Sequence, residues 1–181
     1  MFEVLDEKCT PTKGSKYSAC ADLYAREDIV IGTGETVLVP LGVKIDLEMF
    51  KINKFMGSII SQDMQKHQDN VWDRWLKSHQ LNLHIRSSLS AKHGLIIANG
   101  TGIIDLDYKG EIMICLHNPM KDDSLVSYQD GTIGLDIDSD HSVYIKKGQR
   151  IAQISLVEHK SYLFGVDSEE ERTGGFGSTG E

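Results

Sequence analysis

Two aspartates stand one residue apart in the segment "NGTGIIDLDYKGEI" (residues 99–112), and a tyrosine follows them directly. Asn99-Gly100 is a typical turn signal, and residues 107–110 fit a type I turn with Asp first and Gly fourth. At the rim of a pocket, Asp105 has the chemistry to accept a proton from water, and Tyr108 supplies a flat wall. A polar hairpin tip without a catalytic task explains the same residues equally well. This segment alone leaves both interpretations open.

The segment "RSSLSAKHGL" (residues 86–95) places two hydroxyls directly after an arginine, as Arg86-Ser87-Ser88, with Lys92 close behind. A guanidinium binds phosphate oxygens in a bidentate manner, and hydroxyls and backbone N–H groups fill the remaining acceptors. Serine also caps helix N-termini, which is the competing interpretation. His93 has no His or Cys partner at metal-ligand spacing, so we expect a surface histidine.

Two further polar residues stand among small or aliphatic neighbours. Asp22 lies in "SACADLYA" (residues 18–25), where an acid is able to orient an arginine or a metal-bound water. Gln153 lies in "GQRIAQI" (residues 148–154), which we expect to be a strand. Regular alternation puts Arg150 and Ala152 on one face and Ile151 and Gln153 on the other. The amide of Gln153 then meets either a ligand or a sheet edge.

The C-terminal segment "ERTGGFGSTGE" (residues 171–181) combines a cation, an aromatic ring and two hydroxyls with several glycines. Glycine makes ordering of the backbone costly, so such a segment is disordered unless something holds it. The residue types predict a segment that orders over a ligand bearing phosphates and an aromatic ring. A merely flexible tail is the alternative.

Composition restricts the class of protein. The 181 residues are 40% hydrophobic and 25% charged, as in one soluble globular domain. A net charge of −8 argues against stable nucleic-acid binding. We find neither an apolar run of the ~18–20 residues that a membrane helix needs nor a secretory signal. The three scattered cysteines, Cys9, Cys20 and Cys115, predict no disulfide framework or zinc site, so we expect a cytoplasmic protein, or one of the host cytoplasm if the source is viral.

Short segments rich in Ile, Val and Leu predict strands that must position these side chains. They are Thr36–Leu47, Leu81–Leu89, Gly94–Gly100, Gly110–Asn118 and Gln149–Glu158. Their number and shortness predict an all-β domain, either a sandwich or a jelly-roll barrel.

Two longer segments interrupt this rhythm. In Met49–Gln80 an amphipathic helix is predicted, because apolar residues recur at helical spacing; they are Met64, Val71, Trp72, Trp75 and Leu76. This face packs on a sheet edge or forms a lid or docking helix. Met120–Lys147 is acidic, with a predicted turn at Asp130-Gly131. The aspartates of Asp136–Asp140 resemble the start of a calcium loop, but His141 and Lys147 stand where such a loop needs Gly and Glu. We therefore interpret these aspartates as solvated.

Taken together and in this order, "ACADLYA", "RSSLSAKHGL", "NGTGIIDLDYKGEI", "GQRIAQI" and "RTGGFGSTG" resemble the five motifs of the trimeric dUTP diphosphatase (dUTPase) family. They span Ala19 to Gly180. The resemblance implies a jelly-roll-like β fold and a homotrimer with each active site built from three chains. It implies hydrolysis of dUTP to dUMP and pyrophosphate, with Mg²⁺ held mainly by the triphosphate, which supplies dUMP and limits uracil in DNA.

The resemblance also assigns roles. Asp105 matches the general base, Tyr108 the ring that packs on deoxyribose and excludes a 2′-hydroxyl, and Asp22 the supporting acid of the first motif. The other matches are the uracil-binding hairpin (Asn99, Gly102 and Ile104), the phosphate ligands (Arg86, Ser87, Ser88 and Gln153) and a C-terminal arm (Arg172, Phe176, Gly177, Ser178 and Thr179). The resemblance implies a β domain of residues 1–170, followed by the arm, residues 171–181, which closes over a neighbouring active site. There Arg172, Ser178 and Thr179 grip the terminal phosphate, and Phe176 covers uracil.

Three departures and two alternatives accompany this resemblance. Cys20 replaces the usual Gly of the first motif, "RTGGF" places Arg172 one residue nearer Phe176 than usual, and the segments 49–80 and 120–147 are insertions. A dCTP deaminase shares the fold but carries a catalytic Glu roughly where Cys115 stands, and zinc-deaminase signatures are missing from the sequence. The insertions keep open a nucleotide-sensing protein that binds a protein partner.

Overall fold

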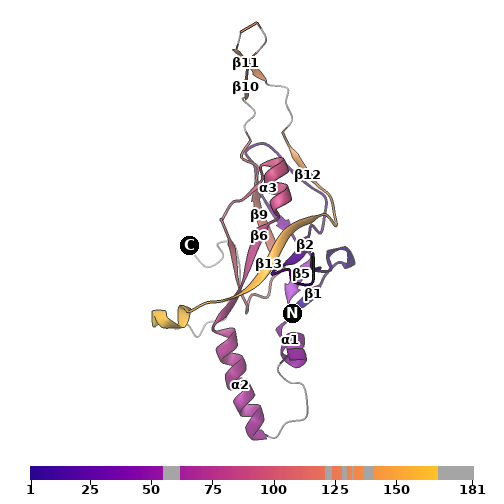
Figure 1. Ribbon diagram of the computed structural model, residues 1–181. Coiled ribbons are helices and arrows are strands. Elements are labelled where there is room, and N and C mark those ends of the chain that lie inside the picture. The colour runs from indigo at the N-terminus through magenta and orange to yellow at the C-terminus, as the bar shows by residue number, and fades with distance from the viewer. Residues whose placement is uncertain (55–61, 121–123, 128–129, 132, 137–140, 167–181) are drawn as a thin grey trace.

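The computed structural model describes residues 1–54, 62–120, 124–127, 130–131, 133–136 and 141–166, and its body is a set of antiparallel sheets (Figure 1). The strands are β1 (Phe2–Val4), β2 (Ala21–Tyr24), β3 (Ile29–Ile31), β4 (Thr36–Pro40), β5 (Val43–Ile45), β6 (His79–Ile85), β7 (Ile96–Ile97), β8 (Gly102–Asp105), β9 (Met113–His117), β10 (Ser124–Ser127), β11 (Ile133–Asp136), β12 (Val143–Ile145) and β13 (Arg150–Glu158). The helices are α1 (Leu47–Lys54), α2 (Gln62–Leu76) and α3 (Ser87–His93), with 3₁₀ turns η1 (Glu7–Cys9) and η2 (Ser161–Phe164).

Two larger sheets carry the body. One has the order β2-β13-β6-β8 and the other β4-β9-β7, while β1 pairs with β5 and β3 with β12. Alternation places one side chain in two in the core, so Leu81 and Leu83 of β6 and Ile114 and Leu116 of β9 are buried. The prediction of an all-β class with an inserted helical segment is confirmed.

The predicted strands are longer than the observed ones. Thr36–Leu47 is divided into β4 and β5, because the chain turns at Gly42, whose φ is +66°. A Cβ on Gly42 would lie 2.6 Å from Cys9 Sγ, so the turn packs tightly on η1. The predicted strand to Leu89 ends at Ile85, since α3 begins at Ser87. Of Gly94–Gly100 only β7 is strand.

The first insertion contains two helices where one was predicted. α1 and α2 extend from one end of the body (Figure 1). Phe50 of α1 packs on Trp72 and Trp75 of α2. Trp72 is 8% exposed and stacks on Trp75, with ring centroids 5.2 Å apart. Val71 is 41% exposed, so it does not share the burial of Trp72, and the side chain of Met64 lies outside the described residues. Among the described residues, no helix has the length and apolar character needed to cross a membrane.

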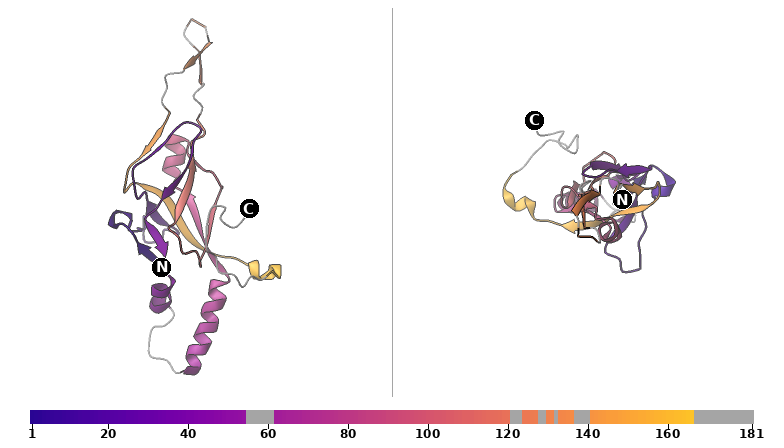
Figure 2. Two further views of the ribbon diagram at one scale, coloured as in Figure 1. Left: turned by 180° about the vertical axis from the view of Figure 1, so that it is seen from behind. Right: turned by 90° about the horizontal axis from the view of Figure 1, so that it is seen from above.

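The second insertion contains the antiparallel hairpin β10–β11, which extends from the end opposite the helices (Figure 1). The predicted turn at Asp130-Gly131 is confirmed, with φ of +84° at Gly131. The side chains of Asp136–Asp140 lie outside what the structure describes, so their solvation stays a prediction. At the other end of the chain, η2 projects sideways from the body in both views of Figure 2.

Candidate active site

The segment 99–112 forms the turn, strand and reversal that hold the predicted base. Gly100, with φ of +74°, donates its N–H to the carbonyl of Ile97 at 3.1 Å, which turns the chain into β8. Asp105 is the last residue of β8 and pairs with Gln80 of β6. The N–H of Tyr108 then bonds to the carbonyl of Asp105 at 3.1 Å. The predicted turn at 107–110 is therefore wrong by two residues, because the chain reverses as soon as the pairing with β6 ends.

A cavity of about 180 Å³ opens between this segment and β9. Its lining residues are Leu83, Ile97, Asn99, Gly102, Ile103, Ile104, Tyr108, Ile112, Met113 and Cys115. The structure thus brings together the four residues predicted to bind a base and sugar: Asn99, Gly102, Ile104 and Tyr108. Gly102 keeps the wall close, since a Cβ there would lie 3.1 Å from Leu83 Cβ. Apolar walls beside a turn with backbone polar groups suit a flat heterocycle.

The ring of Tyr108 is fixed by contacts with the two residues Gly110 and Glu111. Its hydroxyl donates to the carbonyl of Glu111 at 3.3 Å. The ring also covers Gly110 so closely that a Cβ on that residue would overlap the Tyr108 hydroxyl. Glycine is therefore required at position 110 for the space that the ring occupies rather than for a turn.

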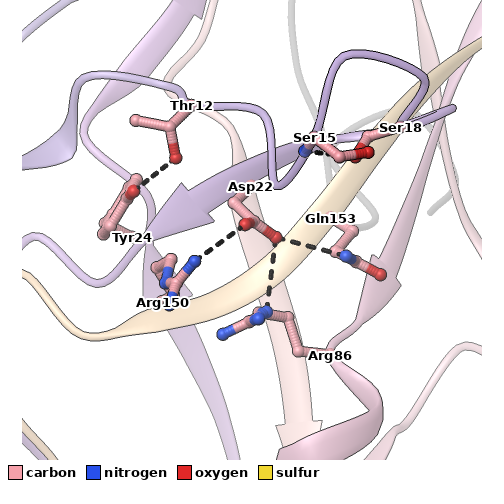
Figure 3. A network of polar contacts seen from close by, with 8 residues as sticks. All are labelled: Thr12, Ser15, Ser18, Asp22, Tyr24, Arg86, Arg150 and Gln153. Atoms are coloured by element: carbon pink, nitrogen blue, oxygen red, sulfur yellow. Dashed lines mark hydrogen bonds and ion pairs between the residues drawn. The ribbon is translucent and has the colours of Figure 1, made fainter.

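Asp22 is the centre of a polar network on the four-stranded sheet (Figure 3). The residue is 3% exposed, and its Oδ1 lies 3.3 Å from Arg86 Nε. Oδ1 also accepts from Gln153 Nε2 at 3.2 Å, and Oδ2 lies 3.3 Å from Arg150 Nη1. The prediction that Asp22 orients an arginine is consistent with these contacts, and three of the predicted residues, Asp22, Arg86 and Gln153, lie together.

A β-bulge explains why Arg150 belongs to this network. In the pairing with β2, Arg150 is opposite Tyr24 and Ala152 is opposite Leu23, so Ile151 is an extra residue. The extra residue brings Arg150 and Gln153 to the same face of the sheet. Our expectation from regular alternation, which separated them, is wrong at this position.

A second cavity, of about 310 Å³, lies beside this network, and its lining is Arg86, Ser88, Leu89, Lys92, His93, Gln149 and Arg150. Ser87 and Ser88 are exposed in the first turn of α3. The N-cap is Arg86, and no side chain caps it, which disfavours serine capping. Arg86, Arg150 and Lys92 line this cavity, and the two arginines share a single buried carboxylate, Asp22, so the cavity favours anions.

The base and the cationic network lie at opposite edges of one sheet. Asp22 is opposite Gln153, which is opposite His84, and four residues further along β6 Gln80 is opposite Asp105. Paired residues share a face, so both carboxylates are on the same side of the sheet. Three strand spacings across and four residues along separate them by about 20 Å.

Some functional candidates lie elsewhere. The predicted arm residues, Arg172, Phe176, Gly177, Ser178 and Thr179, lie outside the described residues, and their roles stay predictions. His93 is exposed, as predicted. Sequence reasoning missed Arg26 and Glu111, whose side chains pair at 3.0 Å. The available signal was a charged residue, Glu111, directly before the buried Ile112.

Comparisons with known proteins indicate one family. A family model described as dUTPase matches residues 77–132. The deoxyuridine 5′-triphosphate nucleotidohydrolase of Rickettsia canadensis is 30% identical over 94% of this chain and 87% of its own. That of Wolbachia pipientis wMel is 32% identical over 94% of this chain and 86% of its own.

Solved structures support the fold. A dUTPase from Streptococcus mutans superposes with a TM-score of 0.56 and 24% identity, covering 88% of this chain and 95% of its own. A variant of the phage 80alpha dUTPase has a TM-score of 0.59 and 21% identity, covering 98% and 97%. With a relative at 32% identity over nearly the whole chain, the conclusion is plain: the chain belongs to the dUTPase family.

Proposed function

We propose that the protein hydrolyses dUTP to dUMP and pyrophosphate. The observation that carries this proposal is the cavity that Asn99, Gly102, Ile104 and Tyr108 line beside the strand ending in Asp105. A base and sugar of the size of deoxyuridine fit this position, with Tyr108 against the sugar. Two relatives named deoxyuridine 5′-triphosphate nucleotidohydrolases support the choice of substrate.

Asp105 is the proposed general base. Its side chain is exposed at the end of β8, directly before the reversal that carries Tyr108. The carboxylate takes a proton from a water molecule, whose oxygen attacks the α-phosphorus. The bond from that phosphorus to the bridging oxygen breaks, and pyrophosphate leaves with its electron pair.

The cationic network is the proposed phosphate site. Arg86, Ser87, Ser88 and Gln153 bind phosphate oxygens, and Asp22 holds Arg86 and Gln153 in place by the contacts described above. In the arm, residues 171–181, Arg172, Ser178 and Thr179 add donors to the terminal phosphate. Phe176 and Gly177 cover the base. Neutralising and aligning the phosphates then lowers the barrier to attack.

The distance between these two sites supports a shared, intersubunit active site. A triphosphate whose α-phosphorus lies beside Asp105 extends only ~7 Å towards its terminal phosphate, by the reach of its covalent bonds. The Asp22 network of the same chain is about 20 Å away by strand geometry. Asp105 of one chain therefore works with Arg86 of a neighbour. A closed homotrimer whose arm crosses to a further site satisfies this requirement.

Mg²⁺ fits this site as an ion carried by the substrate. Among the described residues, no cluster of three or more His, Cys, Asp or Glu side chains is placed to hold a metal. Asp22 is already engaged by two guanidiniums. The ion is then held by phosphate oxygens, where it supplies positive charge. A related phage phi11 dUTPase is described as coordinating a structural Mg(II) ion.

Pyrophosphate release from dUTP, dCTP, dTTP and UTP, each with Mg²⁺, tests the proposal. We expect turnover of dUTP that exceeds the others by at least a hundredfold, since a site built to bond uracil leaves buried groups unpaired with cytosine. Ammonia release from dCTP would indicate a deaminase instead. Nucleotide binding without turnover would indicate a sensing protein that uses the insertions for a partner.

A further inference from the structure

The carboxylate of Glu111 connects the chain that follows Tyr108 to two other parts of the body. Glu111 Oε1 accepts from the N–H of Gly42 at 2.8 Å, and Glu111 Oε2 lies 3.0 Å from Arg26 Nη1. The Glu111 side chain is only 16% exposed. We call Arg26, Gly42 and Glu111 the Glu111 clamp. It joins the chain just after β2, the β4–β5 turn and the chain that follows Tyr108.

Backbone hydrogen bonds hold the same place. Leu41 donates its N–H to the carbonyl of Ile112 at 3.0 Å, and Ile112 donates to Val43 at 2.9 Å. Gly42 itself has no freedom to shift towards η1, because Cys9 fills the space beneath it. The peptide unit at Glu111 is thus fixed against a rigid turn.

That peptide unit receives the hydroxyl of Tyr108. The bond runs from the Tyr108 hydroxyl to the carbonyl of Glu111 at 3.3 Å, while the ring covers Gly110. The ring has therefore two constraints: a tether at its hydroxyl and a contact under its face. Both constraints depend on where the chain at 110–111 lies.

We propose that Glu111, held by Arg26 and the Gly42 N–H, is a positioning residue that sets the ring of Tyr108 and thereby the preference for deoxyribose over ribose. This inference rests on the proposed function. Ribose differs from deoxyribose by one oxygen atom, so a ring excludes it only if the ring stays in place to within about 1 Å. Without the clamp the ring of Tyr108 is able to move aside, so the site discriminates less against the 2′-hydroxyl of ribose while deoxyribose still binds.

The test is the ratio of kcat/KM for dUTP to kcat/KM for UTP. We expect Glu111→Ala and Tyr108→Phe each to lower this ratio by roughly tenfold, mainly through faster turnover of UTP. Glu111→Gln keeps an acceptor for Gly42 but loses the charge that pairs with Arg26, so its ratio falls less. In the Glu111→Ala/Tyr108→Phe double variant the ratio is no lower than in Glu111→Ala alone, because both substitutions loosen the same tether of the ring. Asp73→Asn, which breaks the exposed Asp73–Lys77 ion pair at the end of α2, serves as the control and leaves the ratio unchanged.

Two results overturn the inference. One is an equal proportional loss of kcat/KM for dUTP and for UTP in Glu111→Gln and in Tyr108→Phe. The other is a Glu111→Ala/Tyr108→Phe double variant in which the two reductions of the ratio multiply. Glu111→Gln and Tyr108→Phe are nearly isosteric substitutions, so they keep the test valid if Glu111→Ala fails to fold. The parent protein separates this inference from the proposed function. If the parent releases no pyrophosphate from dUTP, the proposed function fails. If the parent is selective and the variants stay equally selective, only the role of Glu111 fails.

Discussion

The guanidinium of Arg150 reaches the carboxylate of Asp22, at 3.3 Å, because β13 carries one more residue than β2 at the point where they pair. The same carboxylate holds Arg86. Two guanidiniums on one buried acid leave a net positive charge beside the second cavity. That charge is available for a ligand, since Asp22 neutralises only one of the two cations.

Arg150→Met should weaken binding of dUTP by about tenfold, while binding of dUMP changes less than about twofold. The physical reason is that the lost charge lines the cavity proposed for the phosphates and not the pocket proposed for the base. Calorimetric titration in an Asp105→Asn background, which prevents turnover, measures both affinities. The matched control is Lys146→Met, which removes an equal charge from an exposed position nearby. An equal loss of dUTP and dUMP affinity would place Arg150 outside the phosphate site.

Complementation between two inactive variants tests the shared site. Asp105→Asn removes the base and Arg86→Ala removes a phosphate ligand, so we expect each alone to lose at least ~100-fold in kcat/KM. When the two are unfolded together and refolded in equal amounts, about a quarter of the sites receive both intact residues by random assortment. Pyrophosphate release should recover to about that fraction. Mixed trimers that contain both chains, shown by differently tagged copies, yet stay inactive would contradict the intersubunit arrangement.

Gly110→Ala should displace the ring of Tyr108, because the new methyl group takes the space of the phenol. We expect a fall of at least tenfold in kcat/KM for dUTP, with a smaller change in the midpoint of thermal unfolding. Gly14→Ala is the control, since its Cβ would meet Ser18 Oγ at an ordinary 3.5 Å. Unchanged kinetics for Gly110→Ala would mean that the ring position has no effect on turnover.

The thiol of Cys115 lines the base cavity, and burial raises its pKa above the ordinary value. A free thiol has a pKa of about 8.5, so at pH 7.5 Cys115 should stay protonated and react slowly with iodoacetamide. The rate should increase only above the pH range in which an exposed thiol ionises, as the thiolate forms. Saturating dUMP should slow the reaction at Cys115 but not at the partly exposed Cys20, as peptide mass spectrometry will show. Equal protection of both residues would argue against nucleotide in this cavity.

The base-binding part of the site was predictable because its residues are neighbours in sequence. Asn99, Gly102, Ile104 and Tyr108 gather around one cavity because they stand on one continuous segment, residues 99–108. Asp22, Arg86 and Gln153 come from three separate elements, and only the ordered motifs of a family linked them in advance. Their contact depends on the register of β2 with β13, which local propensity does not specify.

The failures have equally specific causes. An Asp-x-x-Gly sequence at 107–110 favours a turn there, but the end of pairing between Asp105 and Gln80 decides where the chain reverses. The run of Ile, Ala and Gln in β13 gives no sign of a bulge, so the face of Arg150 was assigned wrongly. Glu111 drew no attention because its partners, Arg26 and Gly42, are distant in sequence.

The stacked indoles of α2 have a spectroscopic consequence. The chain contains two tryptophans, Trp72 and Trp75, and both lie in the first insertion. Tryptophan fluorescence therefore reports on the helical segment and on its contact with β6, where Trp75 stacks on His79, whereas circular dichroism in the far ultraviolet also reports on the sheets. Melting curves from the two signals will coincide only if helices and sheets unfold as one cooperative unit.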